Sequence, residues 1–169
     1  EYIGGLLGSM YNSILDTASS NVAISVVLES KAHTNQDAWN GNSVGAYTIG
    51  GLIGEGARNS LIKDVTASGA ISVKTTREIT EADDWEGDAS MGSIGGLFGY
   101  MGQSYIKNGT ATNVIVVENN HEINSIGGIA GYSYNSFYDT VTTSGDITIK
   151  LNNRATWLED IGGGFGYTS

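Results

Sequence analysis

One six-residue phrase, Ile-Gly-Gly-x-x-Gly, occurs five times in this chain and constrains its fold more than any other feature. The copies begin at Ile3, Ile49, Ile94, Ile126 and Ile161. A repeat that is too short to bury its own apolar face must stack on its neighbours to do so. The sequence therefore predicts a single repeat domain over residues 1–169, with repeats that start near residues 3, 49, 94, 126 and 161.

Three glycines recur at fixed places in every phrase. The chain has 25 Gly and no Pro. This composition favours bends and close backbone approach at the same place in each turn over a flexible linker. The structural repeat glycines are Gly4, Gly5, Gly8, Gly50, Gly51, Gly54, Gly95, Gly96, Gly99, Gly127, Gly128, Gly131, Gly162, Gly163 and Gly166.

The second half of each repeat has the pattern of a β-strand. Ile24, Ile71, Ile115 and Ile147 each lie 21 or 22 residues after the first Ile of a phrase. Around Ile71, apolar and small polar residues alternate with a period of two. We therefore expect an all-β solenoid of about four turns, with roughly three short strands per turn. Leu6 and Leu7 are adjacent and both apolar, so strict alternation would turn one of them away from the core.

A column of amide side chains is expected at the equivalent place of each turn. Asn12, Asn59, Gln103 and Asn135 are each followed by Ser and two apolar residues. In stacked layers, side-chain amides of this kind can hydrogen-bond to one another along the stack. The sequence therefore predicts an amide ladder at one corner of the solenoid.

The composition argues against several kinds of partner. The net charge of −10 disfavours nucleic acid and anionic membranes. The chain has no Cys, so disulfides and thiolate sites are unavailable. No apolar run reaches the roughly 20 residues of a membrane span. The chain lacks an initiator Met and begins and ends beside a repeat phrase, which predicts a fragment or processed form of a longer chain.

Two long connections between repeats are expected as loop insertions on one side of the solenoid. They contain Trp39 and Trp85, and loops on one face of a repeat array commonly form its recognition surface. Tyr100 and Tyr132 follow the phrase in two turns and complete a candidate binding surface for a glycan or a protein. Such a tyrosine row can also stabilise neighbouring turns.

The candidates for metal binding and catalysis are few. Asp83, Asp84, Glu86 and Asp88 offer oxygen ligands that suit calcium, although a solvated acidic loop explains them equally. No cofactor is otherwise expected. Asp16 and Asp139 share a repeat column with two lysines, which indicates outward charge pairs and not the carboxylate pair of a polysaccharide-cleaving enzyme. We therefore expect no enzymatic activity.

Three copies of the phrase carry a family resemblance. Segments 4–8, 50–54 and 95–99 read Gly-Gly-Leu-x-Gly and precede a Ser-Gly-x-Ile-x-Val type of strand, which resembles the GLUG motif. The later copies depart from it, with Ile129 and Gly164 in place of Leu. The resemblance implies an extracellular or cell-surface location, as in large secreted or surface-anchored bacterial proteins, and brings no catalytic residues.

The expected function follows from the repeat array and this resemblance together. We expect a non-catalytic structural segment of a fibrous protein, such as an adhesin stalk or a filament, with copies of itself as partners through end or edge stacking. The alternative is a module that uses the loop insertions to bind a glycan or a host or surface protein. A β-helix enzyme that cleaves polysaccharides is the third possibility.

Overall fold

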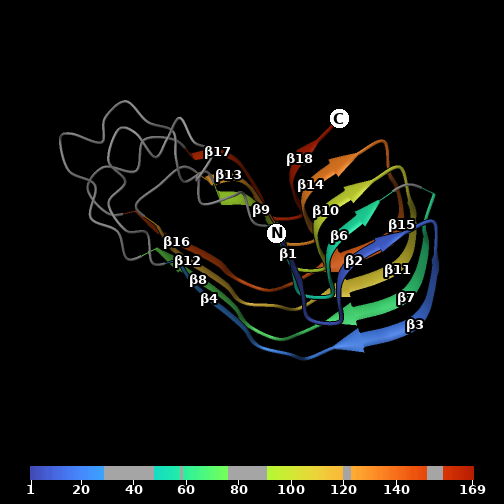
Figure 1. Ribbon diagram of the computed structural model, residues 1–169, viewed down its shortest axis with the longest axis horizontal. Helices are drawn as coiled ribbons and strands as arrows, with labels where there is room; N and C mark the ends of the chain where they lie inside the picture. The colour runs from blue at the N-terminus through green and yellow to red at the C-terminus, as the bar shows by residue number, and fades with distance from the viewer. Residues whose placement is uncertain (29–47, 58, 76–90, 120–122, 152–157) are drawn as a thin grey trace.

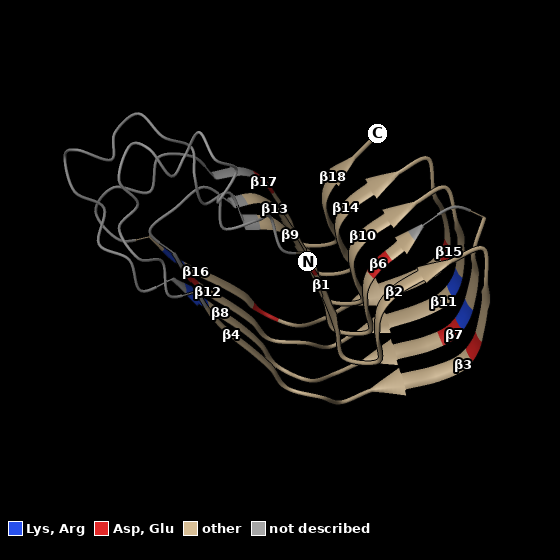
Figure 2. Ribbon diagram, in the orientation of Figure 1, with Lys and Arg blue, Asp and Glu red and all other residues tan. Residues whose placement is uncertain are grey.

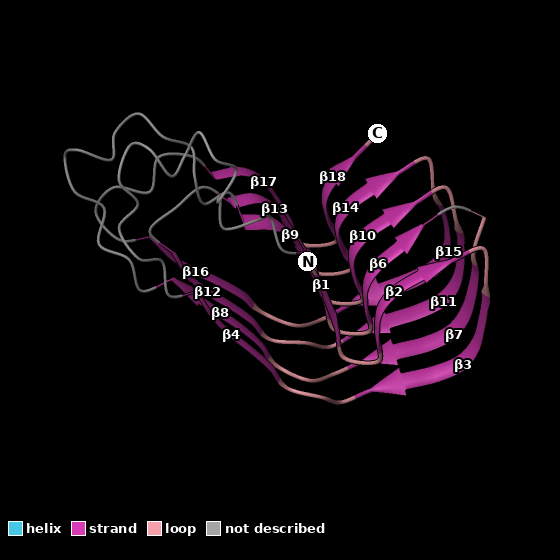
Figure 3. Ribbon diagram, in the orientation of Figure 1, coloured by secondary structure: helices cyan, strands magenta, loops and turns pink. Residues whose placement is uncertain are grey.

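The protein is a parallel β-solenoid (Figure 1). The computed structural model describes residues 1–28, 48–57, 59–75, 91–119, 123–151 and 158–169. These residues form 18 strands in four parallel sheets and include no helix (Figure 3). The predicted all-β solenoid is confirmed. No helix that is long and apolar enough to cross a bilayer is found among the described residues.

Each turn contributes one strand to each sheet, and the chain visits sheets A, B, C and D in that order. Sheet A consists of β1 (Tyr2–Gly4), β5 (Thr48–Gly50), β9 (Met91–Gly95), β13 (Ile123–Gly127) and β17 (Leu158–Gly162). Sheet B consists of β2 (Leu7–Tyr11), β6 (Ile53–Ala57), β10 (Phe98–Gly102), β14 (Ala130–Tyr134) and β18 (Phe165–Thr168). Sheet C consists of β3 (Ile14–Ser20), β7 (Leu61–Ala67), β11 (Tyr105–Ala111) and β15 (Phe137–Thr143). Sheet D consists of β4 (Ile24–Leu28), β8 (Ile71–Thr75), β12 (Ile115–Asn119) and β16 (Ile147–Leu151).

The repeats stack in register, layer on layer. In sheet A, Ile49 pairs with Ile3 on one side and with Ile94 on the other, and Ile126 pairs with both Ile94 and Ile161. Sheet D is equally regular, because Ile71 pairs with Ile24 and Ile115. Equivalent residues of successive repeats therefore form columns that run along the solenoid axis.

A turn has four strands and not the three expected, because the repeat phrase bends in its middle. In the second repeat, β5 ends at Gly50 and β6 begins at Ile53, so the phrase supplies the end of one strand and the start of the next. Leu52 and Ile53 are both fully buried, as are Leu97 and Phe98. The bend resets the alternation of side chains, and two adjacent apolar residues can then face the same core.

The core has two compartments. One lies between sheets B and C and contains Met10, Leu52, Ile53, Ile62, Val65, Ala67, Leu97, Phe98, Met101, Ile106, Ala111, Ile129 and Ala130. The other lies between sheets A and D and contains Ile24, Ile49, Ile71, Val73, Ile94, Ile115, Val117 and Ile126. Most of these residues belong to the middle turns, where the layers above and below cover them.

The glycines of the phrase separate the two compartments by allowing backbones to touch. A Cβ atom on Gly96 would overlap the carbonyl oxygen of Gly128 and lie 2.9 Å from the Cβ of Ala111 in sheet C. A Cβ on Gly99 would lie 2.6 Å from the backbone N of Ile49, where sheets A and B press together. None of the described glycines has a φ between +20° and +160°. Space, and not an unusual conformation, therefore requires glycine here.

Two columns of other residues hold the left-handed conformation. Asn12, Asn59, Gln103 and Asn135 have φ between 45° and 58° and turn the chain from sheet B into sheet C. Thr17, Asp64, Asn108 and Thr140 have φ between 54° and 57° and bend each strand of sheet C in its middle. Asn and Asp tolerate this region better than other non-glycine residues, whereas a β-branched Thr is strained there.

Candidate functional site

The corner between sheets B and C presents the amide column on the surface. We call this surface, formed by Asn12, Asn59, Gln103 and Asn135 with the Ser and the first sheet C residue that follow each of them, the amide corner. The backbone N–H of Asn59 donates to the carbonyl of Gln103 at 2.7 Å, and the N–H of Gln103 donates to the carbonyl of Tyr134 at 2.7 Å. All four amide side chains are exposed.

The hydrogen bonds along this column run through the backbone. Among the residues that the structure describes, no hydrogen bond joins two of the four side-chain amides. The left-handed φ explains why Asn is used, because its short polar side chain tolerates this conformation. The predicted column is therefore present in space, while hydrogen bonding between its side chains stays a prediction that this geometry does not favour.

The serines of the amide corner hold the bend itself. The hydroxyl groups of Ser13, Ser104 and Ser136 donate to the carbonyl two residues earlier, at 2.6, 2.8 and 3.1 Å. The Oγ of Ser136 also accepts a hydrogen bond from the backbone N–H of Ser104 in the layer before it, at 3.2 Å. These hydroxyls stabilise the turn and tie adjacent layers together.

An outward apolar column borders the amides. Ile14 and Phe137 are 72% and 61% exposed, and Tyr105 is 38% exposed. The rings of Tyr105 and Phe137 stack with centroids 5.3 Å apart and planes inclined by 12°. The sequence already contained a signal for this column, because two adjacent apolar residues follow each Asn-Ser or Gln-Ser pair and a strand can bury only one of them. The column itself was not predicted.

A shallow groove, open to solvent and with a volume of about 720 Å³, runs along the amide corner. Its lining repeats the same triplet in three layers: Asn59, Ser60 and Leu61, then Gln103, Ser104 and Tyr105, then Asn135, Ser136 and Phe137. A second hollow of about 600 Å³ continues it past Phe137 toward Tyr138 and Phe165. The groove therefore extends along the axis and across the layers.

The tyrosine row of sheet B is a separate feature. Tyr100 and Tyr132 stack with centroids 5.3 Å apart, and Tyr132 and Tyr167 stack at 4.8 Å. Glu55 occupies the same column one layer below and accepts a hydrogen bond from Tyr11, which contributes most to raising the pKa of Tyr11 to about 12. Stacked rings cover one another's faces, so this row favours the joining of turns over the holding of sugar rings.

Two carboxylates of sheet C, Asp16 and Asp139, are paired with lysines of the neighbouring layer (Figure 2). Lys63 lies 2.6 Å from Asp16, and Lys107 lies 3.8 Å from Asp139. The hydrogen bond from Lys63 is the main cause that lowers the pKa of Asp16. Asp16 and Asp139 are three layers apart, roughly 14 Å at the usual spacing of strands, whereas the two carboxylates of a glycosidase lie about 5–9.5 Å apart.

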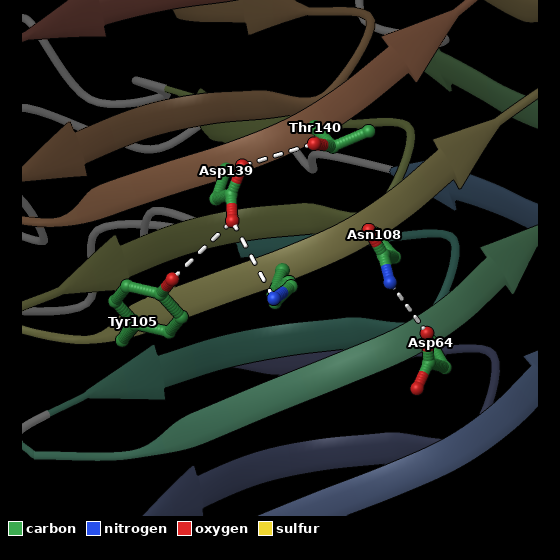
Figure 4. Close-up of polar contacts among 6 residues, drawn as sticks. Asp64, Tyr105, Asn108, Asp139 and Thr140 are labelled. Atoms are coloured by element: carbon green, nitrogen blue, oxygen red, sulfur yellow. Dashed lines mark hydrogen bonds and ion pairs between the residues drawn. The ribbon is translucent and has the colours of Figure 1, made fainter.

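Further polar contacts tie this surface together (Figure 4). Asp139 accepts hydrogen bonds from the hydroxyl groups of Thr140 at 2.9 Å and Tyr105 at 3.4 Å. Asn108 donates to Asp64 of the adjacent layer at 2.8 Å. On sheet D, Glu118 lies 2.7 Å from Lys150 and 3.5 Å from Lys74. These charged columns are occupied by contacts between layers.

Several candidate residues lie outside the described part of the chain. They are Asp83, Asp84, Glu86 and Asp88 of the calcium hypothesis, and Trp39 and Trp85 of the binding hypothesis. Within the described part, no cluster of three His, Cys, Asp or Glu residues that could hold a metal ion is found. Both long insertions fall in the sequence between a strand of sheet D and the next strand of sheet A, and the prediction that they lie on one side of the solenoid concerns residues outside the described part of the chain.

Comparison with known proteins identifies one motif. Residues 45–72, which include the second copy of the phrase and reach into sheet D, match the GLUG motif. The resemblance that the glycine pattern predicted is thus confirmed for this segment. No curated protein and no solved structure matches the chain.

Proposed function

We propose that this GLUG-motif chain is a non-catalytic structural segment of an extracellular fibrous protein, such as an adhesin stalk or a filament. The observation that carries the proposal is the register, in which equivalent residues pair through every turn in all four sheets. The occurrence of the GLUG motif in surface and secreted proteins supports the extracellular location.

The architecture suits a stiff element. Each turn is joined to the next by four ladders of backbone hydrogen bonds, and two apolar compartments fill the space between the sheets. Outward ion pairs and stacked rings join the same layers from outside. Since each layer contacts only its neighbours, the stability of such an array grows with the number of layers.

The two outermost layers supply the surface for end stacking. Leu7 and Leu15 at one end, and Tyr138 and Phe165 at the other, point inward but are only partly buried, unlike their counterparts in the middle layers. A further layer in the same register, from a second copy or from a neighbouring stretch of a longer chain, would bury them and pair the free strand edges. Apolar residues would then meet apolar residues along the core columns.

Electron microscopy and light scattering of the purified chain over a range of concentrations test the proposal. We expect filaments or a mass that rises with concentration. Leu15→Glu should abolish this behaviour, because it places a charge in the exposed end of the core. Ile14→Glu is the matched control, since Ile14 lies on the outward side of the same strand and is 72% exposed. A wild-type chain that stays monomeric and forms no filaments would refute end stacking.

The binding module remains the second candidate because both long insertions fall at the same place in the repeat, after a strand of sheet D and before the next strand of sheet A. Removal of residues 30–46 and 76–90 distinguishes the two functions, and the second deletion must stop before β9, which begins at Met91. A scaffold keeps its assembly after these deletions, whereas a module that recognises its partner through the insertions loses it. Turnover of a polysaccharide by the intact chain would favour the enzyme instead.

A further inference from the structure

The groove of the amide corner repeats with the layers. Its described lining in each of three layers consists of one amide, one serine and one apolar side chain. Among the described residues that line it there is no Asp, Glu, Lys or Arg, although the chain as a whole carries a net charge of −10. The described lining therefore offers a ligand hydrogen bonds and apolar contacts, and no charged group.

The amide groups of the groove are available to such a ligand. Within the described ranges, the side chains of Asn59, Gln103 and Asn135 are exposed and make no hydrogen bond or ion pair. The left-handed backbone at each of them fixes where the side chain leaves the corner. The array thus presents donors and acceptors at a regular interval of one layer, about 4.8 Å.

The other wall of the groove is apolar. Leu61, Tyr105 and Phe137 form it, and the rings of Tyr105 and Phe137 stack on each other and are partly exposed to solvent. A ligand that fits both walls needs hydroxyl or amide groups along one side and C–H groups along the other. It also needs a chemical repeat close to the layer spacing.

We propose that the amide corner binds a linear, neutral polysaccharide that lies along the solenoid axis with one sugar unit per layer. A pyranose chain joined through equatorial bonds is extended, and it advances by about the length of one ring per sugar unit, close to the layer spacing of about 4.8 Å. A polypeptide strand advances only about 3.3 Å per residue and loses register within two layers. A nucleic acid is repelled by the negative chain.

The site is distinct from the loop insertions. The amide corner joins sheets B and C (Figure 1), whereas each insertion follows a strand of sheet D and precedes a strand of sheet A in the sequence. The tyrosine row of sheet B is also a separate surface, because its residues are not among the described residues that line the groove. The proposal does not depend on the scaffold function, since binding requires the columns of a single copy and not their assembly.

Titration calorimetry with defined oligosaccharides tests the proposal. The probes are hexamers of β-1,4-linked glucose and of β-1,4-linked N-acetylglucosamine, with the α-1,4-linked glucose hexamer as a control whose chain coils. We expect the extended hexamers to bind and the coiled hexamer not to bind. Affinity should rise with chain length from the dimer and level off at about three units, the number of layers that line the groove.

Variants locate the site. The double variant Gln103→Glu with Asn135→Asp keeps the shape of both side chains, removes two pairs of donors and adds charge. It should weaken binding by about tenfold or more. The control pair Asn21→Asp with Ser68→Asp adds the same charge at exposed positions of the corner between sheets C and D and should leave the affinity unchanged. Circular dichroism confirms that each variant is folded.

Three results would overturn the inference. One is the absence of binding of both extended hexamers at millimolar concentration. Another is binding that the groove variant and its control weaken equally. The third is binding that disappears when the insertions are deleted and persists in the groove variant, since it would assign the site to the insertions. Filament formation by the same samples is measured separately, so failure of this inference leaves the scaffold proposal standing.

Discussion

Substitution of a single repeat glycine tests the close approach between the two core compartments. In Gly96→Ala, the added methyl group would overlap the carbonyl oxygen of Gly128 and lie 2.9 Å from the Cβ of Ala111, and atoms of this kind essentially never approach within 3.0 Å. Neither neighbour can rotate away, because one is backbone and the other is a methyl group. The strand of one layer must therefore move away from the next.

The magnitude follows from the contacts that such a movement breaks. Overpacking of a core costs roughly 1–3 kcal/mol. A shift of the layer also stretches the bonds from the N–H of Gly96 to the carbonyl of Gly127 and from the N–H of Leu97 to the carbonyl of Ile129, now 3.1 and 2.9 Å. At about 1 kcal/mol for each bond, the total loss is roughly 3–5 kcal/mol. For a chain of this size, 1 kcal/mol lowers Tm by about 2–4 °C.

Thermal and urea unfolding, followed by circular dichroism, provide the measurement. We expect Gly96→Ala to melt at least about 6 °C below the wild type. Gly163→Ala is the matched control, because Gly163 holds the same place in the last phrase and has nothing within 4 Å of its added Cβ. It should be neutral or stabilise the chain by up to about 1 kcal/mol through a less flexible unfolded state.

The comparison between the two variants is decisive. If Gly96→Ala and Gly163→Ala melt within about 2 °C of each other, the layers do not pack through their glycines as described, and the glycines would be explained by backbone flexibility alone. If both are destabilised strongly, the last layer is covered in solution by further structure.

Two other perturbations probe the surface of sheet C. Thr140→Asn should stabilise the protein by about 1 kcal/mol, measured by urea unfolding, because Thr140 has φ 57° and Asn tolerates that region, whereas Thr142→Asn should give no such gain. Hydrogen bonds from Lys63 and Lys150 are the main cause that lowers the pKa of Asp16 and of Glu118, respectively. The two ionised carboxylates therefore stabilise the folded chain above the ordinary carboxyl pKa of about 4. This stabilisation is lost as the pH falls through their lower folded-state pKa values. The urea midpoint should therefore fall as the pH is lowered below about 5, and it should fall less in the double variant Asp16→Asn with Glu118→Gln; an equal fall would refute the role of these pairs.

The stacking of the repeats could be predicted because identical residues recur at a nearly constant offset. Ile49, Ile71 and their equivalents stand in the same columns that the sequence alignment of the repeats placed them in. Their burial follows from the period-two alternation around Ile71, which the structure shows from Val65 to Val73. Sequence reasoning succeeded where one local rule, the strand period, agreed with the internal repeat.

The number of strands per turn could not be predicted, because a bend between sheets A and B interrupts that period. The glycines at this bend were correctly read as points of close approach, but the sequence did not show which backbones approach. The left-handed positions were also hidden. Asn12 and its equivalents suggested a side-chain ladder, and Thr17 and Thr140 gave no signal at all, since Thr seldom adopts this conformation.

The outward columns differ in whether their side chains contact one another between layers. This difference separates structural columns from a candidate binding surface. Asp16 and Lys63 pair with each other, Tyr100 and Tyr132 stack on each other, and both columns join layers. The amides of the amide corner do neither, because the left-handed bend that requires them already directs the backbone bonds along the axis. The amide side chains of this column make no hydrogen bonds within the described part of the protein. They can therefore bind a ligand without breaking a contact that stabilises the fold. We therefore expect mutations in the paired columns to change stability, and mutations of the exposed amide groups that keep the backbone conformation to change binding.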